Sequence, residues 1–434
     1  MSVPQSEEKI AIIGAGPVGI SAARALKLKS IAYDQFEADD DIGGNWRHGV
    51  YATAHIISSR KTTEFPDFPM PQNYPDFPSA AQMLDYLNSY AEHYQLKDQI
   101  IFNTEVERVS ANKDGLWDLK LSNGETRTYN GVIVCNGHHW DRRWPSYPGK
   151  FSGEFLHSKD YENSEQLKGK RVLVIGGGNS ACDIVAEAAR VATTAHLSLR
   201  RGYWFLPKTL YGIPTAELLN TWMPVWMQRI YLGLLLKIVV GDYRDYGLMK
   251  PDHKLFDHHP TINTELLHYL KHGKITPHPD IRKFDGRVVE FVDGVREEFD
   301  TVICGTGFNV SVPFLEPGLV EIRGPIVKAH WGMVSPHSRN LFVYGWAQAR
   351  YGFGPLLTPA SELLADLILL QRRLKHPLGE VLTKMNQPLP SSHLLDPMEA
   401  LKQLKAARKV LFLVPFIDKY CMPNAHTEEI KLKL

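Results

Sequence analysis

The strongest constraint on the fold is a short pattern that occurs twice in the chain. "GAGPVG" at 14–19 and "GGGNSA" at 176–181 each follow a run of β-branched and other apolar residues, "KIAIIG" and "RVLVIG". Apolar residues at helical spacing come directly after both glycine turns. A strand, a glycine turn and a helix in this order start a βαβ unit, whose strands are parallel. The sequence therefore predicts an α/β protein with two such units.

The first glycine turn has the spacing G-x-G-x-x-G, which is typical of dinucleotide sites. Gly14 allows the tight turn, Gly16 lets the backbone approach a pyrophosphate, and Gly19 lets the helix pack on the sheet. The helix N-terminus supplies free N–H groups to the phosphates. An acidic residue about 20 positions on binds a ribose hydroxyl, and we expect Glu37 in this role, with Asp34 as the second choice.

The second turn has the same spacing but a different strand after its helix. Gly176 and Gly178 occupy the glycine positions, and Asn179 and Ser180 open the helix. The next strand, "LSLRR", ends in Arg200 and Arg201 and not in a carboxylate. A guanidinium binds a 2′-phosphate, which a carboxylate would repel. The second site therefore favours NADPH over NADH, and the pair of sites indicates a flavin enzyme, with FAD in the first.

The rest of the composition excludes several other classes. The net charge of +1 gives no sign of a nucleic-acid partner. The four cysteines form no C-x-x-C, which argues against a disulfide reductase and a zinc site. The 18 histidines are scattered, so no metal site is expected. With no dithiol to receive them, the electrons of the reduced flavin go to another acceptor, and O2 is the obvious one.

We expect the two units to be Rossmann-like FAD and NADPH domains, the second inserted in the first. The predicted boundaries are 1–165 for the first part of the FAD domain, 166–300 for the NADPH domain and 301–434 for the rest of the FAD domain with a helical tail. Residues 203–250 form a helical or irregular insertion in the NADPH domain. Ser79 and Gln82 are spaced as a capping box at the start of a helix over 79–94.

Between the glycine turns lies "FSGEFLHSKDY", residues 151–161. It matches the fingerprint F-x-G-x-x-x-H-x-x-x-[Y/W] with Phe151, Gly153, His157 and Tyr161, and here the chain resembles the flavin-containing monooxygenases. "DDDIGGNW", the aromatic and proline-rich segment 65–87, "VCNGHHW" and "CGTGF" are also similar to that family, so the likeness covers nearly the whole chain.

The resemblance implies further FAD contacts. These fall at Gly44, Asn45, Trp46 and Val106 and at Thr358, taken as the N-cap of a helix over 358–374 whose positive end faces the flavin. The family has an asparagine in the loop after the G-G-x-W turn, which this chain lacks. Ser58 is our guess for its replacement.

The fingerprint stretch itself is expected to couple the two domains. His157 would bridge to the NADPH domain, Gly153 would provide a bend, and Phe151 would anchor the stretch in the FAD-domain core.

The activity implied is oxygenation of an amine nitrogen or a sulfide sulfur, with NADPH and O2, through a C4a-hydroperoxyflavin. Tyr161–Glu162 favours this branch over Baeyer–Villiger oxygenation of ketones, whose fingerprint ends in Trp followed by Pro or Asp. An uncoupled NADPH oxidase is the other alternative, supported by the missing asparagine.

Apolar runs within 203–250, the longest of them near 231–241, and at 410–417 leave the partners of the protein open. Each run could be core, a substrate tunnel, a homodimer interface or a peripheral membrane contact. None is long enough to cross a bilayer. The N-terminus lacks the pattern of a secretory signal, so a cytoplasmic location is expected.

Overall fold

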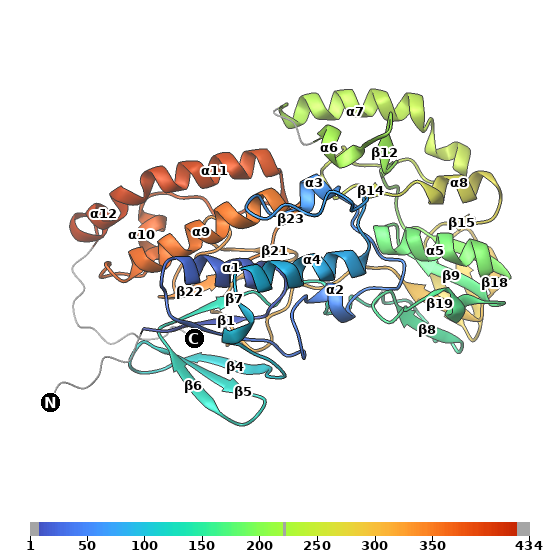
Figure 1. The fold of residues 1–434 in the computed structure, drawn as a ribbon. Helices are drawn as coiled ribbons and strands as arrows, with labels where there is room; N and C mark the ends of the chain where they lie inside the picture. Colours follow the sequence, from blue (N-terminus) through green and yellow to red (C-terminus); the bar gives the residue numbers. More distant parts are fainter. Residues whose placement is uncertain (1–7, 220–222, 423–434) are drawn as a thin grey trace.

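The computed structural model describes residues 8–219 and 223–422. Two five-stranded parallel sheets dominate it (Figure 1). The first sheet has the order β22-β7-β1-β2-β3. Its strands are β1 (Ile10–Ile13), β2 (Tyr33–Phe36), β3 (Ile100–Ile101), β7 (Gly131–Val134) and β22 (Leu341–Val343). All four strand pairs are parallel, as the glycine pattern predicts.

The alternation of side chains along β1 explains the layers around this sheet. Ile10 and Ile12 face a core shared with three helices, whereas Ala11 and Ile13 face a core shared with an antiparallel sheet. Figure 1 shows these helices above the strands and the antiparallel sheet below them. The helices are α1 (Pro17–Leu28), α4 (Ala80–His93) and α9 (Gly354–Gln371), and the antiparallel strands are β4 (Val106–Ala111), β5 (Trp117–Leu121) and β6 (Thr126–Tyr129).

The second sheet repeats this plan in the order β15-β10-β9-β19-β8. Its strands are β8 (Glu154–His157), β9 (Arg171–Ile175), β10 (Thr194–Ser198), β15 (Thr276–His278) and β19 (Thr301–Cys304). Val172 and Val174 pack with α5, and Leu173 and Ile175 pack toward a second antiparallel sheet. The covering elements are α5 (Asn179–Val191), α8 (Glu265–Lys271), β16 (Ile281–Asp285), β17 (Val288–Phe291) and β18 (Arg296–Glu298).

Strand pairing corrects the domain boundaries expected from the sequence. β8 lies before residue 166 and β19 after residue 300, yet both belong to the second sheet. The chain therefore enters this sheet at 154 and leaves it at 304. The local pattern of a buried strand does not say which sheet it joins, because that depends on partners distant in sequence.

The sequence also misplaced the start of α9. This helix begins at Gly354, with Phe353 as N-cap and Pro355 in its first turn, so Thr358 and Pro359 lie inside it. The helix over 79–94 is confirmed as α4, with the capping box of Ser79 and Gln82 present.

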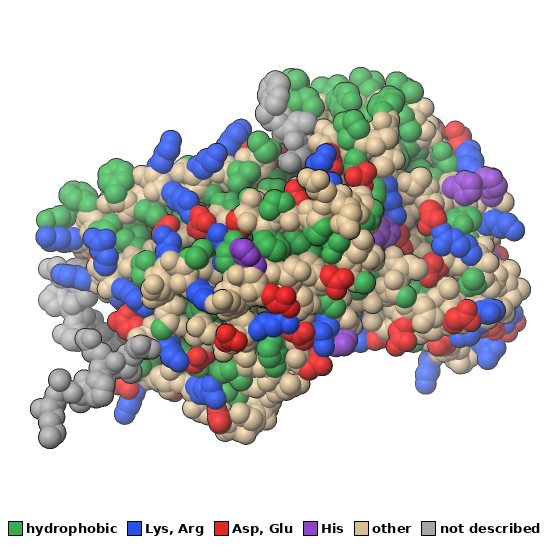
Figure 2. Space-filling model, viewed as in Figure 1, with side chains coloured by type: hydrophobic (Ala, Val, Ile, Leu, Met, Phe, Trp, Pro, Cys, Tyr) green, Lys and Arg blue, Asp and Glu red, His purple; other side chains and the backbone are tan. Residues whose placement is uncertain are grey.

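The described residues of the insertion 203–250 include short strands and the helices α6 (Thr215–Leu219) and α7. Its long helix α7 (Val225–Val239) exposes Trp226, Ile230, Leu234 and Ile238, which are spaced four residues apart on one face. Figure 2 shows hydrophobic side chains gathered over this helix. No helix in the described part of the chain is long and apolar enough to cross a membrane.

The C-terminal tail is helical and also exposes apolar side chains, Phe412 and Phe416 among them. Its helices are α10 (Leu378–Lys384), α11 (Pro397–Val410) and α12 (Val414–Tyr420). The other short elements are α2 (Asn45–His48), α3 (Arg60–Thr63), α6 (Thr215–Leu219), β11 (Phe205–Leu206), β12 (Thr209–Leu210), β13 (Ile213–Pro214), β14 (Thr261–Ile262), β20 (Ile322–Arg323), β21 (Ile326–Val327), β23 (Gln348–Ala349), β24 (Leu394–Leu395), η1 (Lys97–Gln99), η2 (Ser164–Leu167), η3 (Tyr243–Tyr246) and η4 (Leu411–Leu413).

Candidate active site

The first glycine turn lies where the strand order of the first sheet reverses, between β1 and β7. Gly14 has φ +98°, and a Cβ there would stand 2.7 Å from the carbonyl oxygen of Cys135, just past β7. A Cβ on Gly19 would stand 2.0 Å from the carbonyl oxygen of Gly14. These two positions therefore require glycine for the fold itself. Ligands of parallel sheets bind outside the carboxyl ends of the strands at such a reversal.

Gly16 has a different reason to be glycine. It caps α1, and its Cβ would lie 3.7 Å from the Cα of Gly44, in ordinary van der Waals contact. The two glycines let the first turn and the start of α2 approach closely, and we call residues 14–19 and 44–46 together the cradle. Glu37, at the end of β2, accepts the Ala15 amide at 2.5 Å. Asp34 instead pairs with Lys9 and Tyr129, so Glu37 is the carboxylate at the turn.

The other residues expected at the first site differ in how deeply they are buried. Asn45 and Trp46 open α2, and the Trp46 ring is half-buried against the helical core. Val106 is buried at the start of β4, in the same core as Ile13. Thr358 is buried inside α9 and donates its hydroxyl to Asp67, so it does not cap that helix.

The second glycine turn repeats the geometry of the first. Gly176 has φ +118°, and a Cβ there would stand 2.4 Å from the carbonyl oxygen of Gly305, just past β19. Gly178 caps α5, and a Cβ there would meet nothing within 4 Å. The ring of Tyr203 lies on Gly177. The open space above Gly178 is what a phosphate at the helix N-terminus needs.

Of the residues expected at the second site, some are hydrogen-bonded within the fold and one is exposed to solvent. Asn179 accepts the Ile262 amide at 2.8 Å, and Ser180 hydrogen-bonds with Tyr51. Arg200 is exposed beyond the end of β10 and makes no ion pair with any residue that the structure describes. Arg201 is engaged: its guanidinium contacts His258 and lies 5.3 Å from the centre of the Tyr203 ring.

The stretch 151–161 contributes β8 and its flanks to the second sheet. Phe151 packs with Phe155 and Phe284 on the second sheet, so the expectation that it anchors in the core of the first domain is wrong. A Cβ on Gly153 would stand 2.6 Å from the carbonyl oxygen of Asp300. Gly153 is thus required by close approach of two backbones, and it does not have a positive φ.

His157 is fully buried at the end of β8. Its Nδ1 accepts the Lys159 amide at 3.1 Å, so Nε2 carries the proton and donates to the Gly307 carbonyl at 3.0 Å. Burial lowers the pKa of the imidazole. The neutral ring therefore ties β8 to the loop after β19, close to the point where Gly305 meets Gly176.

The same stretch also reaches back to the first part of the chain. Lys159 Nζ donates to Asn45 Oδ1 at 3.0 Å and to the Gly49 carbonyl at 3.3 Å. Tyr161 donates to Glu187 of α5 at 2.5 Å. One short segment thus holds the cradle of the first turn and the helix of the second turn in a defined relative position.

Ser58 lies in a loop that packs on the start of α9. Its hydroxyl pairs with that of Thr63 at 2.7 Å. Cβ atoms on Gly352 and Gly354 would stand 2.1 Å and 2.2 Å from the carbonyl oxygens of Thr62 and Thr63. The loop therefore lies against the helix N-terminus, where the positive end of the dipole is strongest.

Three residues that sequence reasoning missed lie past the carboxyl ends of β7 and β22. Asn136 Oδ1, His138 Nε2 and Trp346 Nε1 are buried and have no hydrogen-bond partner among the described residues. Burial lowers the pKa of His138 to about 4, so its ring is neutral at pH 7. Unpartnered buried polar atoms at the strand ends fit a polar ligand beside the first turn. The segment "VCNGHHW" was the available signal for two of them.

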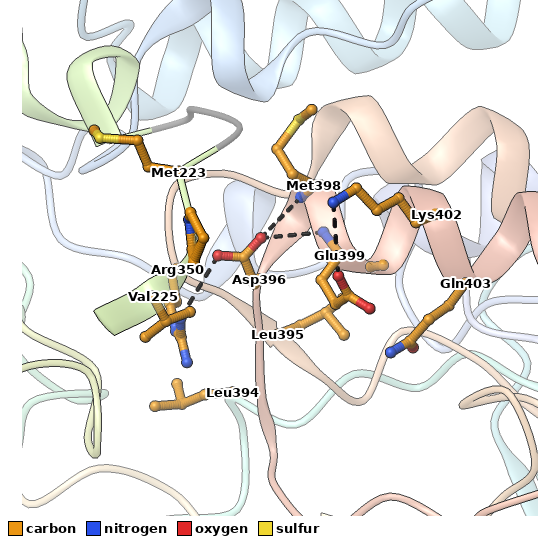
Figure 3. A pocket seen from close by; sticks show the side chains of 12 residues that line it. Met223, Val225, Arg350, Leu394, Leu395, Asp396, Met398, Glu399, Lys402 and Gln403 are labelled. Carbon is orange, nitrogen blue, oxygen red and sulfur yellow. Dashed lines mark hydrogen bonds and ion pairs between the residues drawn. The ribbon is translucent and has the colours of Figure 1, made fainter. Parts of the chain in front are cut away.

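A pocket of about 500 Å³ lies between the insertion and the C-terminal tail (Figure 3). Its apolar lining comes from Met223, Val225, Leu394, Leu395 and Met398. Arg350 and Asp396 point toward one another on its wall, with nitrogen and oxygen 3.6 Å apart. Arg350 lies four residues before the start of α9 in the sequence.

The fold and the two glycine turns define a mixed α/β protein with parallel sheets. Its closer affiliation comes from comparison with known proteins. The model of the family described as "FMO-like: Flavin-binding monooxygenase-like" matches residues 7–344. The chain belongs to this family.

Curated relatives agree with the family model. Human flavin-containing monooxygenase 5 is 33% identical over 350 residues, which span 74% of this chain and 66% of the relative, just under two thirds of its length. "Dimethylaniline monooxygenase [N-oxide-forming] 2" of Rattus norvegicus is 31% identical over 359 residues, which span 76% of this chain and 67% of that protein.

Solved structures show the same fold at lower sequence identity. A cyclohexanone monooxygenase in an open form has a TM-score of 0.72 at 16% identity, and the alignment covers 92% of this chain and 97% of that protein. OTEMO in complex with FAD and NADP has a TM-score of 0.67 at 19% identity and covers 84% of each chain.

Proposed function

We propose that this chain is an NADPH- and O2-dependent flavoprotein monooxygenase that oxygenates soft nucleophiles, an amine nitrogen or a sulfide sulfur. The observation that carries the proposal is the pair of glycine turns, each at the reversal point of a parallel sheet and joined by the stretch 151–161. The two sheets then form Rossmann-like domains for FAD and NADPH, with the second, at 154–304, inserted in the first.

The residues of the first turn fit FAD. The cradle would hold the pyrophosphate, because neither Gly16 nor Gly44 carries a side chain there and the start of α1 offers free amides. Glu37, which accepts the Ala15 amide, would bind a ribose hydroxyl. Asn136, His138 and Trp346 offer unpartnered polar atoms further along the strand ends. When bound, FAD supplies the redox chemistry, taking hydride from NADPH and activating O2.

The chain's own residues position and shield the reactants. The N-terminus of α9 places a positive dipole end beside the loop of Ser58, which favours negative charge there. His138 stays neutral at pH 7 and adds no competing charge. Lys159 holds the second sheet against the cradle, and His157 fixes β8, which carries Lys159, to the loop after β19. This placement matters because a misplacement of about 1 Å can cost about 100-fold in rate.

Two observations support the choice of substrate class. The N-oxide-forming relative oxidises nitrogen by its name, and the mixed pocket of Figure 3 suits a molecule with an apolar body and one polar atom. The likeness to cyclohexanone monooxygenase is one of fold. Ketone oxygenation and uncoupled oxidation of NADPH remain the alternative outcomes of the assay.

The test uses the purified chain with NADPH, ¹⁸O2 and one of three compounds: an aryl methyl sulfide, a tertiary amine or a cyclic ketone. We expect labelled sulfoxide or N-oxide in near-equal amount to the NADPH consumed. Labelled lactone from the ketone alone would establish Baeyer–Villiger activity. Hydrogen peroxide equal to the NADPH consumed, with no labelled product, would establish the oxidase.

The exposed face of α7 and the apolar side chains of α12 suit a homodimer interface or a peripheral membrane contact. The cytoplasmic location stays a prediction.

A further inference from the structure

Three side chains that are far apart in sequence converge on one point beside the edge of the second sheet. His196 comes from β10, His278 ends the edge strand β15, and Glu297 comes from β18 of the antiparallel sheet. One ligand atom of each lies within 4.8 Å of the others. The three elements belong to the part of the fold at the right of Figure 1. No two of these residues have a metal-ligand spacing in the sequence, so no local pattern reveals the cluster.

The distances in this cluster are close to those of a tetrahedral metal site. His196 Nδ1 lies 2.9 Å from His278 Nε2 and 3.2 Å from Glu297 Oε2. Ligand atoms about 2.0–2.1 Å from a tetrahedral zinc ion lie about 3.3 Å from one another. The 2.9 Å separation is that of a hydrogen bond between the two rings, so an ion would replace this bond and move the two nitrogens apart by about 0.4 Å.

Charge and burial point the same way. His196 and His278 are 7% and 8% exposed, and burial lowers the pKa of both imidazoles, that of His196 to about 4. Both rings are therefore neutral at pH 7, which is the form that binds metals. Glu297 adds one negative charge, and Asp293 adds a second negative charge close to His278.

The hydrogen bonds within the cluster do not satisfy all of its acceptors. If His196 carries its proton on Nδ1, this single N–H faces two acceptors, His278 Nε2 and the Glu297 carboxylate. The rings are held in place from outside: His278 stacks on Phe291 at 4.0 Å between ring centres, and His196 meets the edge of Phe299 at 5.0 Å. Rigid, neutral imidazoles with a carboxylate form a donor set suited to zinc.

We propose that His196, His278 and Glu297 bind a divalent transition-metal ion, with Zn²⁺ the best match, and that the ion joins the edge of the second sheet to β18. Glu297 has 35% of its side chain exposed, so water can supply the fourth ligand from that side. The ion stabilises the region next to the NADPH turn, because the Leu199 amide, beside Arg200, donates to the His278 carbonyl.

Two surface clusters of side chains could bind metal weakly, so their histidines are first replaced. They are Asp39 and Asp40 with His48, and the helical pair His268 and His272. The reference protein is therefore the full chain without a histidine tag, carrying His48→Ala, His268→Ala and His272→Ala. It is treated with a chelator, dialysed against micromolar ZnCl2, and its zinc content is measured by plasma mass spectrometry.

We expect one zinc per chain in the reference protein and a higher melting temperature with zinc than without it. Glu297→Gln keeps the shape of a partly exposed side chain and should lower zinc affinity at least about 100-fold, as should His278→Gln. Replacing zinc by Co²⁺ should give the visible absorption of a four-coordinate site. Far-UV circular dichroism checks that each variant is folded.

Zinc that fails to bind to the reference protein, or that binds equally to Glu297→Gln, would overturn the proposal and leave a shared proton as the role of the cluster. If His278→Gln does not fold, Glu297→Gln decides the question alone. The result is independent of the oxygenase assay, since zinc binding is measured without NADPH or substrate.

Discussion

Replacing Arg200 by alanine should weaken NADPH binding selectively. Arg200 lies beyond the carboxyl end of β10, next to the second glycine turn, and it has no ion-pair partner among the described residues. Its guanidinium is therefore free to bind the 2′-phosphate that distinguishes NADPH from NADH. Because nothing in the fold depends on it, Arg200→Ala should leave the melting temperature unchanged.

The magnitude follows from exposure. A charge-assisted hydrogen bond contributes about 1.5–3 kcal/mol. Arg200 is exposed, and solvent screens such contacts, so we expect the lower end of that range, about 1.5 kcal/mol. This corresponds to about a tenfold rise in the Kd for NADPH, with 3 kcal/mol and about 150-fold as the upper bound. NADH lacks the phosphate, and its Kd should change by less than about twofold.

The assay measures both dissociation constants by isothermal titration at two salt concentrations. The loss should shrink at high salt, because the Debye length falls from about 10 Å at 0.1 M to about 3 Å at 1 M. Lys274→Ala is the matched control: it removes an exposed charge just before the amino end of β15, which pairs with β10, whereas Arg200 follows the carboxyl end of β10. Arg201→Ala should act on both cofactors, since Arg201 supports Tyr203 over the turn.

Equal losses for NADPH and NADH in Arg200→Ala would refute the phosphate role. An equal loss in Lys274→Ala would show that only the overall charge of the domain matters.

Further variants test the other parts of the site. Gly178→Ala should lower NADPH affinity and cost at most about 1 kcal/mol in stability, because the added Cβ meets nothing in the fold. Gly176→Ala should fold poorly, because Gly176 has φ +118°. Similar melting temperatures for the two variants would contradict this explanation. Ser58→Ala should leave flavin reduction unchanged and increase peroxide release, and Ser58→Asn should decrease peroxide release. Stopped-flow absorbance and a peroxide assay measure both quantities. If neither variant changes peroxide release, the loop has another role. His157→Ala should keep its flavin, lose about 1–3 kcal/mol of stability and reduce flavin more slowly. A His157→Ala protein with parental rate and coupling would show that the stretch is a plain connector.

Much of the local structure could be predicted from the sequence. The two strand–glycine–helix units, the capping box of α4 and the free arginine after β10 depend on residues close together in the chain. Gly14 and Gly176 could be picked out for the same reason, since a tight turn between a strand and a helix demands a positive φ. Such features are determined by backbone sterics and short-range hydrogen bonds, which the order of residues specifies directly.

The tertiary structure alone decided which elements meet. β8 and β19 read as ordinary buried strands, and only their pairing with β9 places them in the second sheet. The start of α9 is set by its packing on the loop 58–64, through Gly352 and Gly354, and the composition of the helix does not reveal it. His196, His278 and Glu297 are separated by up to about 100 residues, yet one sheet edge brings their ligand atoms within 4.8 Å. Contacts of this kind depend on burial and strand register across the whole chain, so no local pattern of residues encodes them.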